Sequence, residues 1–285
     1  MKNVVLKSYG KVNLFLKVGK NLKNKKLHNV QSLIFLISLN DKIIIQETNQ
    51  LNDTVKFVGR FKKNVNSSNS VSKCLTLLRK KGFLKKKVGY KITIKKDIPA
   101  FSGFGGGSSN AATIIKYFLK GKKISKKTIN YFSKFLGSDL RVFLKSKKIF
   151  QKNLLTIIKF KKNYKFYFVL IYPFLRSSTK DAYSRLNKFE RIQNKNNYRS
   201  NSRLDLVSRL KLENNSLEKV VISKFPLVKK ILKELELIKN CEFSRLTGSG
   251  SACFGLFLNK RDGALALKQI KKRFPKFWCV LSKTI

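Results

Sequence analysis

The chain has 285 residues and 42% hydrophobic content, which is enough for one large or two medium domains with a buried core. It carries 64 basic and 14 acidic residues, a formal net charge of +50, with four scattered cysteines and one histidine. The cysteine spacing excludes the ordinary zinc motifs and gives no disulfide framework, which is typical of a reducing compartment. The apolar runs at 29–40 and 166–175 are too short to span a bilayer, and we expect a cytoplasmic protein.

The positive charge has two explanations. One is binding to a polyanion such as RNA, since a charge of this size attracts nucleic acid whatever the fold. The other is mutational bias, because Lys, Asn, Ile and Phe share AT-rich codons. The 52 lysines are spread along the whole chain, and only 12 basic residues are arginine, the side chain that binds phosphates and bases in a bidentate manner. We favour the bias, and nonspecific polyanion binding stays open.

Secondary structure in the first half mixes strands and helices. Apolar alternation and β-branched residues predict strands over 4–18, 30–39, 42–47, 54–58 and 90–96. Helices are expected over 68–81, 109–120 and 125–136. Asn69 or Ser70 is the expected N-cap of the first helix, and Ser108 or Ser109 that of the second. Gly137 is expected to end the third helix.

The second half begins with a change in composition. Residues 186–202 are polar and rich in asparagine, which indicates a surface loop or a short solvated helix. Helices are expected over 214–223, 225–239 and 261–273, and strands over 242–247, 252–258 and 277–283. There is no internal repeat. The order predicts an α+β protein with domains at 1–155 and 156–285.

A glycine-rich stretch at 98–112, IPAFSGFGGGSSNAA, lies between a predicted strand and a predicted helix. Consecutive glycines expose backbone N–H groups, and the helix N-terminus behind them adds partial positive charge, so the geometry suits a phosphate. The spacing is that of neither the Walker motif nor the dinucleotide fingerprint. A flexible turn before a helix is the alternative.

Three motifs together favour a phosphate-binding loop over a flexible turn. The stretch at 99–112 resembles the second motif of the GHMP kinases, P-x-x-x-G-L-G-S/G-S-S-A/D/N-A. Residues 9–16, YGKVNLFL, resemble the first motif of that family, and residues 246–254, LTGSGSACF, resemble the third. The resemblance implies a two-domain α+β kinase, with an N-terminal domain like the second domain of ribosomal protein S5 and a ferredoxin-like C-terminal domain.

Four further stretches resemble one branch of the family. They lie at 26–33, 136–144, 172–183 and 215–218. This resemblance implies transfer of phosphate from ATP to the 2-hydroxyl of a cytidine-diphosphate-linked methylerythritol, a small-molecule substrate of the non-mevalonate isoprenoid pathway. Two alternatives stay open: another small-molecule kinase of the same family, and a degenerate basic nucleic-acid-binding protein.

The resemblance assigns roles residue by residue. Asp139 would be the general base, and Lys11 would pair with it and stabilise the moving phosphoryl group. The residues that would contact ATP are Asn69, Pro99, Gly103, Gly105, Gly106, Gly107, Ser108 and Ser109. ATP chemistry implies Mg²⁺, whose ligands stay open, with Ser109 the nearest candidate.

The residues that would contact the substrate match the family pattern less completely than those that would contact ATP. Asn13 would bind near the reacting hydroxyl, His28 would hydrogen-bond the cytosine, and Thr179 and Tyr183 would contact the substrate. The chain departs from the family pattern at four positions, with Leu27 in place of a stacking tyrosine, Phe101 in place of a small residue, Arg141 in place of a proline and Gly10 in place of an alanine. The oligomeric state is left open by the sequence.

Overall fold

The computed structural model describes residues 3–21, 27–65, 69–122, 124–192 and 200–285. The chain divides into two compact units, each built from several segments. The first unit comprises Met1–Gly10, Leu39–Ala100 and Gly105–Ser146, and the second comprises Lys11–Ser38, Phe101–Phe104 and Lys147–Ile285. The domain boundary at 155/156 stays a prediction. Residues 26, 68 and 193–199, which belong to predicted motifs and elements, lie outside the described residues.

Two long paired strands, β1 (Val4–Asn21) and β2 (His28–Thr48), contribute to both units. In the first unit, β2 pairs antiparallel with β4 (Gly89–Lys95), and β3 (Thr54–Val58) pairs parallel with β4. The prediction of separate strands at 30–39 and 42–47 is wrong, because β2 is continuous. Its polar position Asp41 is fully buried, with its carboxylate accepting hydrogen bonds from the N–H groups of Asp97 and Ile98. A paired carboxylate therefore continues the strand where the sequence indicates a break.

The described part of the first unit contains four α-helices, together with the 3-10 helix η1 (Lys62–Asn64). They are α1 (Ser70–Lys80), α2 (Gly106–Phe118), α3 (Lys126–Leu136) and α4 (Leu140–Lys145). Asn69 caps α1 through its side chain, and Gly137 ends α3, both as predicted. The predicted start of α2 is wrong, because the N-cap is Gly105 and Ser109 lies inside the helix. Gly106 and Gly107 are therefore in the first turn of α2, and Gly103 and Gly105 precede it.

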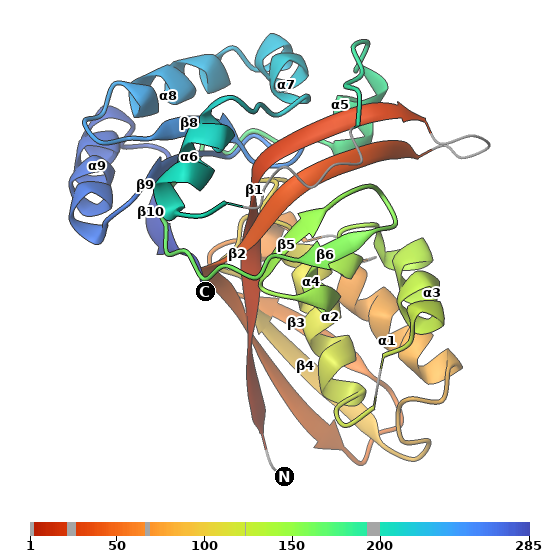
Figure 1. The fold of residues 1–285 in the computed structure, drawn as a ribbon. Coiled ribbons are helices and arrows are strands. Elements are labelled where there is room, and N and C mark those ends of the chain that lie inside the picture. Colours follow the sequence, from red (N-terminus) through yellow and green to blue (C-terminus); the bar gives the residue numbers. More distant parts are fainter. Residues whose placement is uncertain (1–2, 22–26, 66–68, 123, 193–199) are drawn as a thin grey trace. The chain divides into compact units, whose positions relative to one another are not determined.

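The second unit contains a four-stranded antiparallel sheet in the order β10-β7-β9-β8. These strands are β7 (Tyr167–Tyr172), β8 (Phe243–Leu246), β9 (Cys253–Phe257) and β10 (Trp278–Lys283). Helices α8 (Leu227–Glu236) and α9 (Lys260–Arg273) pack on this sheet, as Figure 1 shows. Apolar side chains from β7, α8 and α9, including Val169, Ile231 and Ile270, form one buried core between them.

The remaining elements of the second unit are shorter. They are β5 (Lys148–Gln151), β6 (Ile157–Lys159), α5 (Thr179–Ser184), α6 (Arg203–Lys211) and α7 (Glu218–Lys224). β5 pairs antiparallel with the Ser32–Phe35 part of β2 and with β6. The predicted helix over 214–223 is shorter, since α7 begins at Glu218 after a turn in which Asn215 Oδ1 accepts the N–H of Leu217. The predicted α+β class is confirmed, with two sheets and helices on each unit.

Candidate functional site

The N-termini of α1 and α2 lie side by side in the first unit. A methyl group placed on Gly107 would lie 3.1 Å from the Ser70 hydroxyl oxygen, which measures how close the two helix starts are. Gly105 precedes α2 in the left-handed conformation, with φ of 73°, and has no side chain to cap the helix. The first N–H groups of a helix lack intrahelical partners. We name residues 105–109 the phosphate loop, because this helix start is suited to an anion.

Ser109 is held inside the first unit by two hydrogen bonds. Its hydroxyl donates to the Tyr9 carbonyl at 2.6 Å and accepts from the Ser8 hydroxyl at 2.8 Å. The side chain is 2% exposed, and its N–H donates to the Gly105 carbonyl at 2.9 Å. Ser109 therefore ties the start of α2 to β1, and its hydroxyl already has its partners within the protein.

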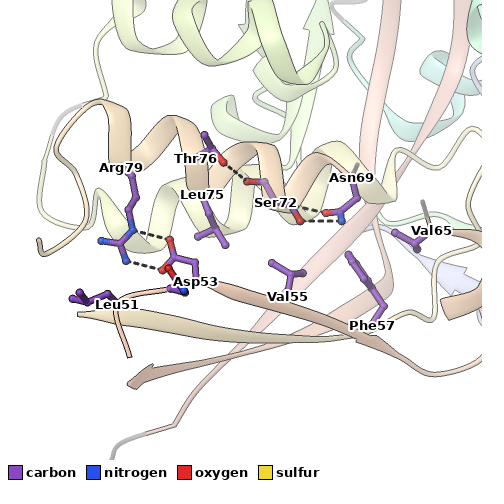
Figure 2. Close-up of a pocket in the computed structure, with 11 residues that line it drawn as sticks. Leu51, Asp53, Val55, Phe57, Val65, Asn69, Ser72, Leu75, Thr76 and Arg79 are labelled. Carbon is purple, nitrogen blue, oxygen red and sulfur yellow. Dashed lines mark hydrogen bonds and ion pairs between the residues drawn. The ribbon is translucent and has the colours of Figure 1, made fainter. Parts of the chain in front are cut away.

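A cavity of about 560 Å³ lies between α1 and β3 in the first unit (Figure 2). It is lined by Leu51, Asn52, Asp53, Val55, Phe57, Val65, Asn69, Ser72, Leu75, Thr76 and Arg79. At one end Asn69 Oδ1 accepts the N–H groups of Val71 and Ser72, both at 3.0 Å. At the other end Arg79 forms a two-bond ion pair with Asp53, at 2.6 and 2.7 Å. The lining is therefore mixed: polar side chains are fixed at both ends, and apolar side chains such as Val55, Phe57 and Leu75 lie between them.

Asp139 immediately precedes the short helix α4 in the first unit. The chain turns at Gly137, whose φ is 96°, and the Asp139 carbonyl accepts the Val142 N–H at 3.0 Å. The Asp139 carboxylate makes no capping hydrogen bond to α4. Arg141 donates its N–H to the Ser138 carbonyl at 3.3 Å, a bond that the family's proline could not make. The departure at Arg141 is therefore accommodated by the backbone.

In the second unit, Lys11 and Asn13 lie on the same face of β1 and are almost fully buried. The Lys11 ammonium donates to the Asn13 side-chain carbonyl. Asn13 in turn donates its side-chain N–H to the Ser32 hydroxyl at 2.9 Å and its backbone N–H to the Thr247 hydroxyl at 3.2 Å. Both predicted side chains are thus held in fixed positions by partners that the sequence did not identify, Ser32 and Thr247.

The third-motif loop, residues 247–252, presses against residues 101–104 of the same unit. A methyl group on Gly103 would lie 1.9 Å from the Thr247 carbonyl oxygen, and one on Gly250 would lie 2.0 Å from the Ser102 carbonyl carbon. A methyl group on Gly248 would lie 3.0 Å from the Lys11 nitrogen. The second and third motifs are therefore in direct backbone contact, beside the Lys11 ammonium.

The two phenylalanines of the 98–112 stretch differ in burial and in backbone conformation. Phe104 is fully buried, with its ring 6.2 Å from that of Trp278 in an edge-to-face arrangement. Phe101 adopts a left-handed conformation with φ of 59°, its side chain is 42% exposed, and the Arg176 guanidinium lies 5.8 Å from its ring. The departure at Phe101 therefore places a ring on the surface in a backbone conformation that favours glycine.

His28 lies among aromatic rings of the second unit. Its ring stacks on Phe189 at 5.3 Å, is tilted against Tyr183 at 5.5 Å, and has Nδ1 3.3 Å from the Gly19 carbonyl oxygen. Leu27, where the family has tyrosine, is 53% exposed. Phe189 was missed from the sequence, because it lies in a polar stretch without a strong local pattern. It supplies an aromatic face beside His28 that Leu27 does not.

Thr179 begins α5 and contacts the third-motif loop, with its hydroxyl 2.7 Å from the Ser249 hydroxyl. Ser177 donates to the Ser249 carbonyl at 2.6 Å. The structure thus brings Lys11, Asn13 and Thr179 to one glycine loop of the second unit. In the first unit it places Asn69, Gly106, Gly107 and Ser108 at the two adjacent helix starts, and Pro99 is buried at the approach to them. The predicted pairing of Lys11 with Asp139 joins residues of different units and stays a prediction.

Within the described ranges, no group of three or more His, Cys, Asp or Glu side chains is placed to hold a metal ion. None of the helices described is both long and apolar enough to cross a membrane.

Comparison with known proteins gives two family matches. Residues 69–140 match the model of the GHMP kinases N terminal domain, and residues 195–276 match that of the GHMP kinases C terminal domain. A 4-diphosphocytidyl-2-C-methyl-D-erythritol kinase of Pelagibacter ubique is 37% identical over 287 residues, which cover 100% of both chains. The kinase of the same name from Thermodesulfovibrio yellowstonii is 30% identical and covers 98% of this chain and 97% of its own.

Solved structures with the same fold include several kinases. A 4-(cytidine 5'-diphospho)-2C-methyl-D-erythritol kinase superposes with a TM-score of 0.73 at 21% identity, over 99% of this chain and 100% of the other. A homoserine kinase from Cytophaga hutchinsonii superposes with a TM-score of 0.67 at 17% identity, over 100% of this chain and 95% of the other. These two likenesses establish the architecture alone.

Proposed function

The chain belongs to the GHMP kinases, and we propose that it transfers the γ-phosphate of ATP to the 2-hydroxyl of 4-diphosphocytidyl-2-C-methyl-D-erythritol. The proposal is carried by the similarity, at 37% identity over the full chain, to a 4-diphosphocytidyl-2-C-methyl-D-erythritol kinase. The glycine-rich N-terminus of α2, which is suited to a phosphate, supports it. The two-domain kinase fold expected from the sequence is confirmed. The division at 155/156 is consistent with the two family matches, which lie on either side of it.

ATP would bind to the first unit through two adjacent features. The N–H groups of Gly106, Gly107 and Ser108 would bind the phosphates, because they form the first turn of α2 and carry its positive dipole end. The cavity between α1 and β3 would take the adenine, with Asn69 at its polar end. Gly105 would let the backbone approach the nucleotide, since it has a positive φ. A contact between Gly103 and ATP stays a prediction, since Gly103 belongs to the second unit.

Phosphoryl transfer needs positioned charges more than covalent chemistry. Asp139 would accept the proton of the attacking hydroxyl, and Lys11 would stabilise charge on the transferred group. Asn13 orients the Lys11 ammonium through its side-chain carbonyl. Ser32 and Thr247 would act by holding Asn13 in place.

The cytidine end of the substrate would lie against His28, Phe189 and Tyr183. A pyrimidine can stack on an aromatic ring, and Phe189 would provide that face in place of the family tyrosine missing at Leu27. His28 would hydrogen-bond the base edge, and Thr179 would contact the substrate beside the third-motif loop.

Mg²⁺ would enter as part of the nucleotide substrate. Within the described ranges no three-ligand cluster is present, and Mg²⁺ commonly binds through substrate phosphates with few protein ligands. The Ser109 hydroxyl donates to the Tyr9 carbonyl and accepts from Ser8, which leaves one lone pair on a side chain that is 2% exposed, so Ser109 as a metal ligand stays a prediction. Location in the cytoplasm stays a prediction from the cysteine pattern, and nonspecific binding to polyanions stays a prediction from the net charge.

The test is a phosphorylation assay of the full chain with radiolabelled ATP and a panel of alcohols. We expect transfer to 4-diphosphocytidyl-2-C-methyl-D-erythritol, and none to homoserine or mevalonate. Asp139→Asn should lower the rate by about 10²–10⁴-fold, the usual contribution of a general base. Asp205→Asn is the matched control, because Asp205 forms a surface ion pair with Arg209 on α6.

Two results would contradict the proposal. One is absence of transfer to the methylerythritol substrate by the wild-type chain. The other is an Asp139→Asn variant as active as Asp205→Asn. RNA binding that falls steeply with salt and survives Asp139→Asn, in a chain without kinase activity, would instead support the polyanion-binding alternative.

A further inference from the structure

Helix α4 carries the proposed base but is very short. It has six residues, and Asp139 stands directly before its first residue. An isolated helix of this length is unstable in water, so its position depends on tertiary contacts. Leu140, Val142 and Phe143 are buried and anchor its apolar face. The hydrophobic effect is not directional, so a hydrogen bond at the end of α4 would add a directional restraint to this packing.

Lys116 provides such a bond. Its ammonium donates to the Phe143 carbonyl at 2.6 Å. Phe143 is among the last four residues of α4, whose carbonyls have no intrahelical partner. A cation at this end also complements the helix dipole. Lys116 therefore acts as a C-terminal cap that is supplied by another helix.

The helix that supplies the cap is α2, which starts at the phosphate loop. Lys116 lies in the last turn of α2, and α2 packs against α4 within the first unit. Desolvation at this contact lowers the pKa of the Lys116 ammonium, while the residue as a whole occupies an exposed position. Replacing Lys116 thus removes the hydrogen bond without removing core volume.

We propose that Lys116 is a positioning residue for phosphoryl transfer, which fixes α4, and with it the Asp139 carboxylate, relative to the start of α2. This inference rests on the proposed function, in which the start of α2 binds the ATP phosphates. The reacting groups of a kinase must be held within a fraction of an ångström, so a loosened α4 costs turnover rather than nucleotide binding.

The experiment compares three single variants of the full chain. Lys116→Met should lower kcat by about 10-fold to 100-fold, the cost of a misplacement near 1 Å, with KM for ATP changed less than about 2-fold. Lys116→Arg should restore most of kcat, because a guanidinium can donate to the same carbonyl. Lys120→Met makes the same change four residues along, at another exposed position, and should behave like the wild-type chain.

Hydrogen exchange gives a second measurement that does not depend on activity. Lys116→Met should speed exchange at the amides of Val142 and Phe143, and Lys120→Met should not. Equal kcat in the two methionine variants, or unchanged exchange at these amides in Lys116→Met, overturns the inference. An inactive wild-type chain would instead overturn the proposed function, so the two failures are distinguishable.

Discussion

The phosphate loop and the third-motif loop are both rich in glycine, for different physical reasons. At Gly107 a methyl group would meet, among the described residues, only the Ser70 side chain within 4 Å, at 3.1 Å. At Gly250 a methyl group would lie 2.0–2.2 Å from three backbone atoms of Ser102 and Gly103. Glycine at 107 thus leaves space beside the helix start, where we propose that the ATP phosphates bind, and glycine at 250 is needed because two backbones touch.

Gly250→Ala should have the largest effect. The added methyl overlaps backbone atoms that cannot move aside, so we expect a loss of at least about 3 kcal/mol in unfolding free energy, at the upper end of overpacking costs. Denaturant unfolding measures it. The matched control is Gly82→Ala, where φ is +68° but nothing lies within 4 Å, with an expected cost of about 1 kcal/mol from backbone strain. A Gly250→Ala chain as stable as Gly82→Ala would show that the two loops are not in contact.

Gly107→Ala should affect binding and not folding. Gly107 is exposed within the first turn of α2, where alanine is favoured over glycine by about 1 kcal/mol, so stability should stay level or rise. We expect the dissociation constant for ATP to rise about 10-fold, equivalent to 1.4 kcal/mol, because the methyl occupies space beside the phosphate-binding N–H groups. Calorimetric titration measures it.

Ser70→Ala in the Gly107→Ala background is the control for this prediction, since it removes the 3.1 Å contact with the Ser70 hydroxyl. Weak binding in both variants means that the methyl blocks the nucleotide directly. Unchanged ATP affinity in Gly107→Ala would show that the phosphates bind elsewhere.

Phe101→Gly should have the smallest effect. It relieves a left-handed φ worth about 1–2 kcal/mol but adds unfolded-state freedom and removes the Arg176 contact, each worth about 0.5–1 kcal/mol. The net change in unfolding free energy should be under about 1 kcal/mol on these terms. Phe104→Ala, three residues away and fully buried, should cost about 3–5 kcal/mol. Similar losses in the two variants would mean that the Phe101 ring is packed as well.

The sequence predicted those helix ends and strands that depend on residues close to one another in the chain. Neighbouring residues predicted the N-cap at Asn69 and the end of α3 at Gly137. They also predicted β8 and β9, the two strands on either side of the third-motif loop. The start of α2 was placed too late, because serine is a common N-cap and the glycines before it carry no helical signal. In the structure Ser109 bonds to Tyr9, a partner one hundred residues away in sequence.

The partners of the predicted site residues could not be found in this way. Ser32 and Thr247 hold Asn13, and each is an ordinary strand or loop residue in its own neighbourhood. Phe189 reaches His28 from a polar segment. Such contacts depend on tertiary pairing across long sequence separations. Ser32 and Thr247 lie within motif stretches, but resemblance to a motif does not say which side chain each residue bonds.

The buried ring of Phe104 has a practical consequence. Its edge-to-face neighbour, Trp278, is the single tryptophan of the chain. Indole emission shifts with the polarity around the ring, so the tryptophan fluorescence of the unmodified protein comes from one side chain, whose ring lies beside that of Phe104. A change that moves the Phe104 ring should therefore shift the wavelength of the tryptophan emission maximum. Trp278 is thus an intrinsic fluorescent probe of the segment that leads into the phosphate loop.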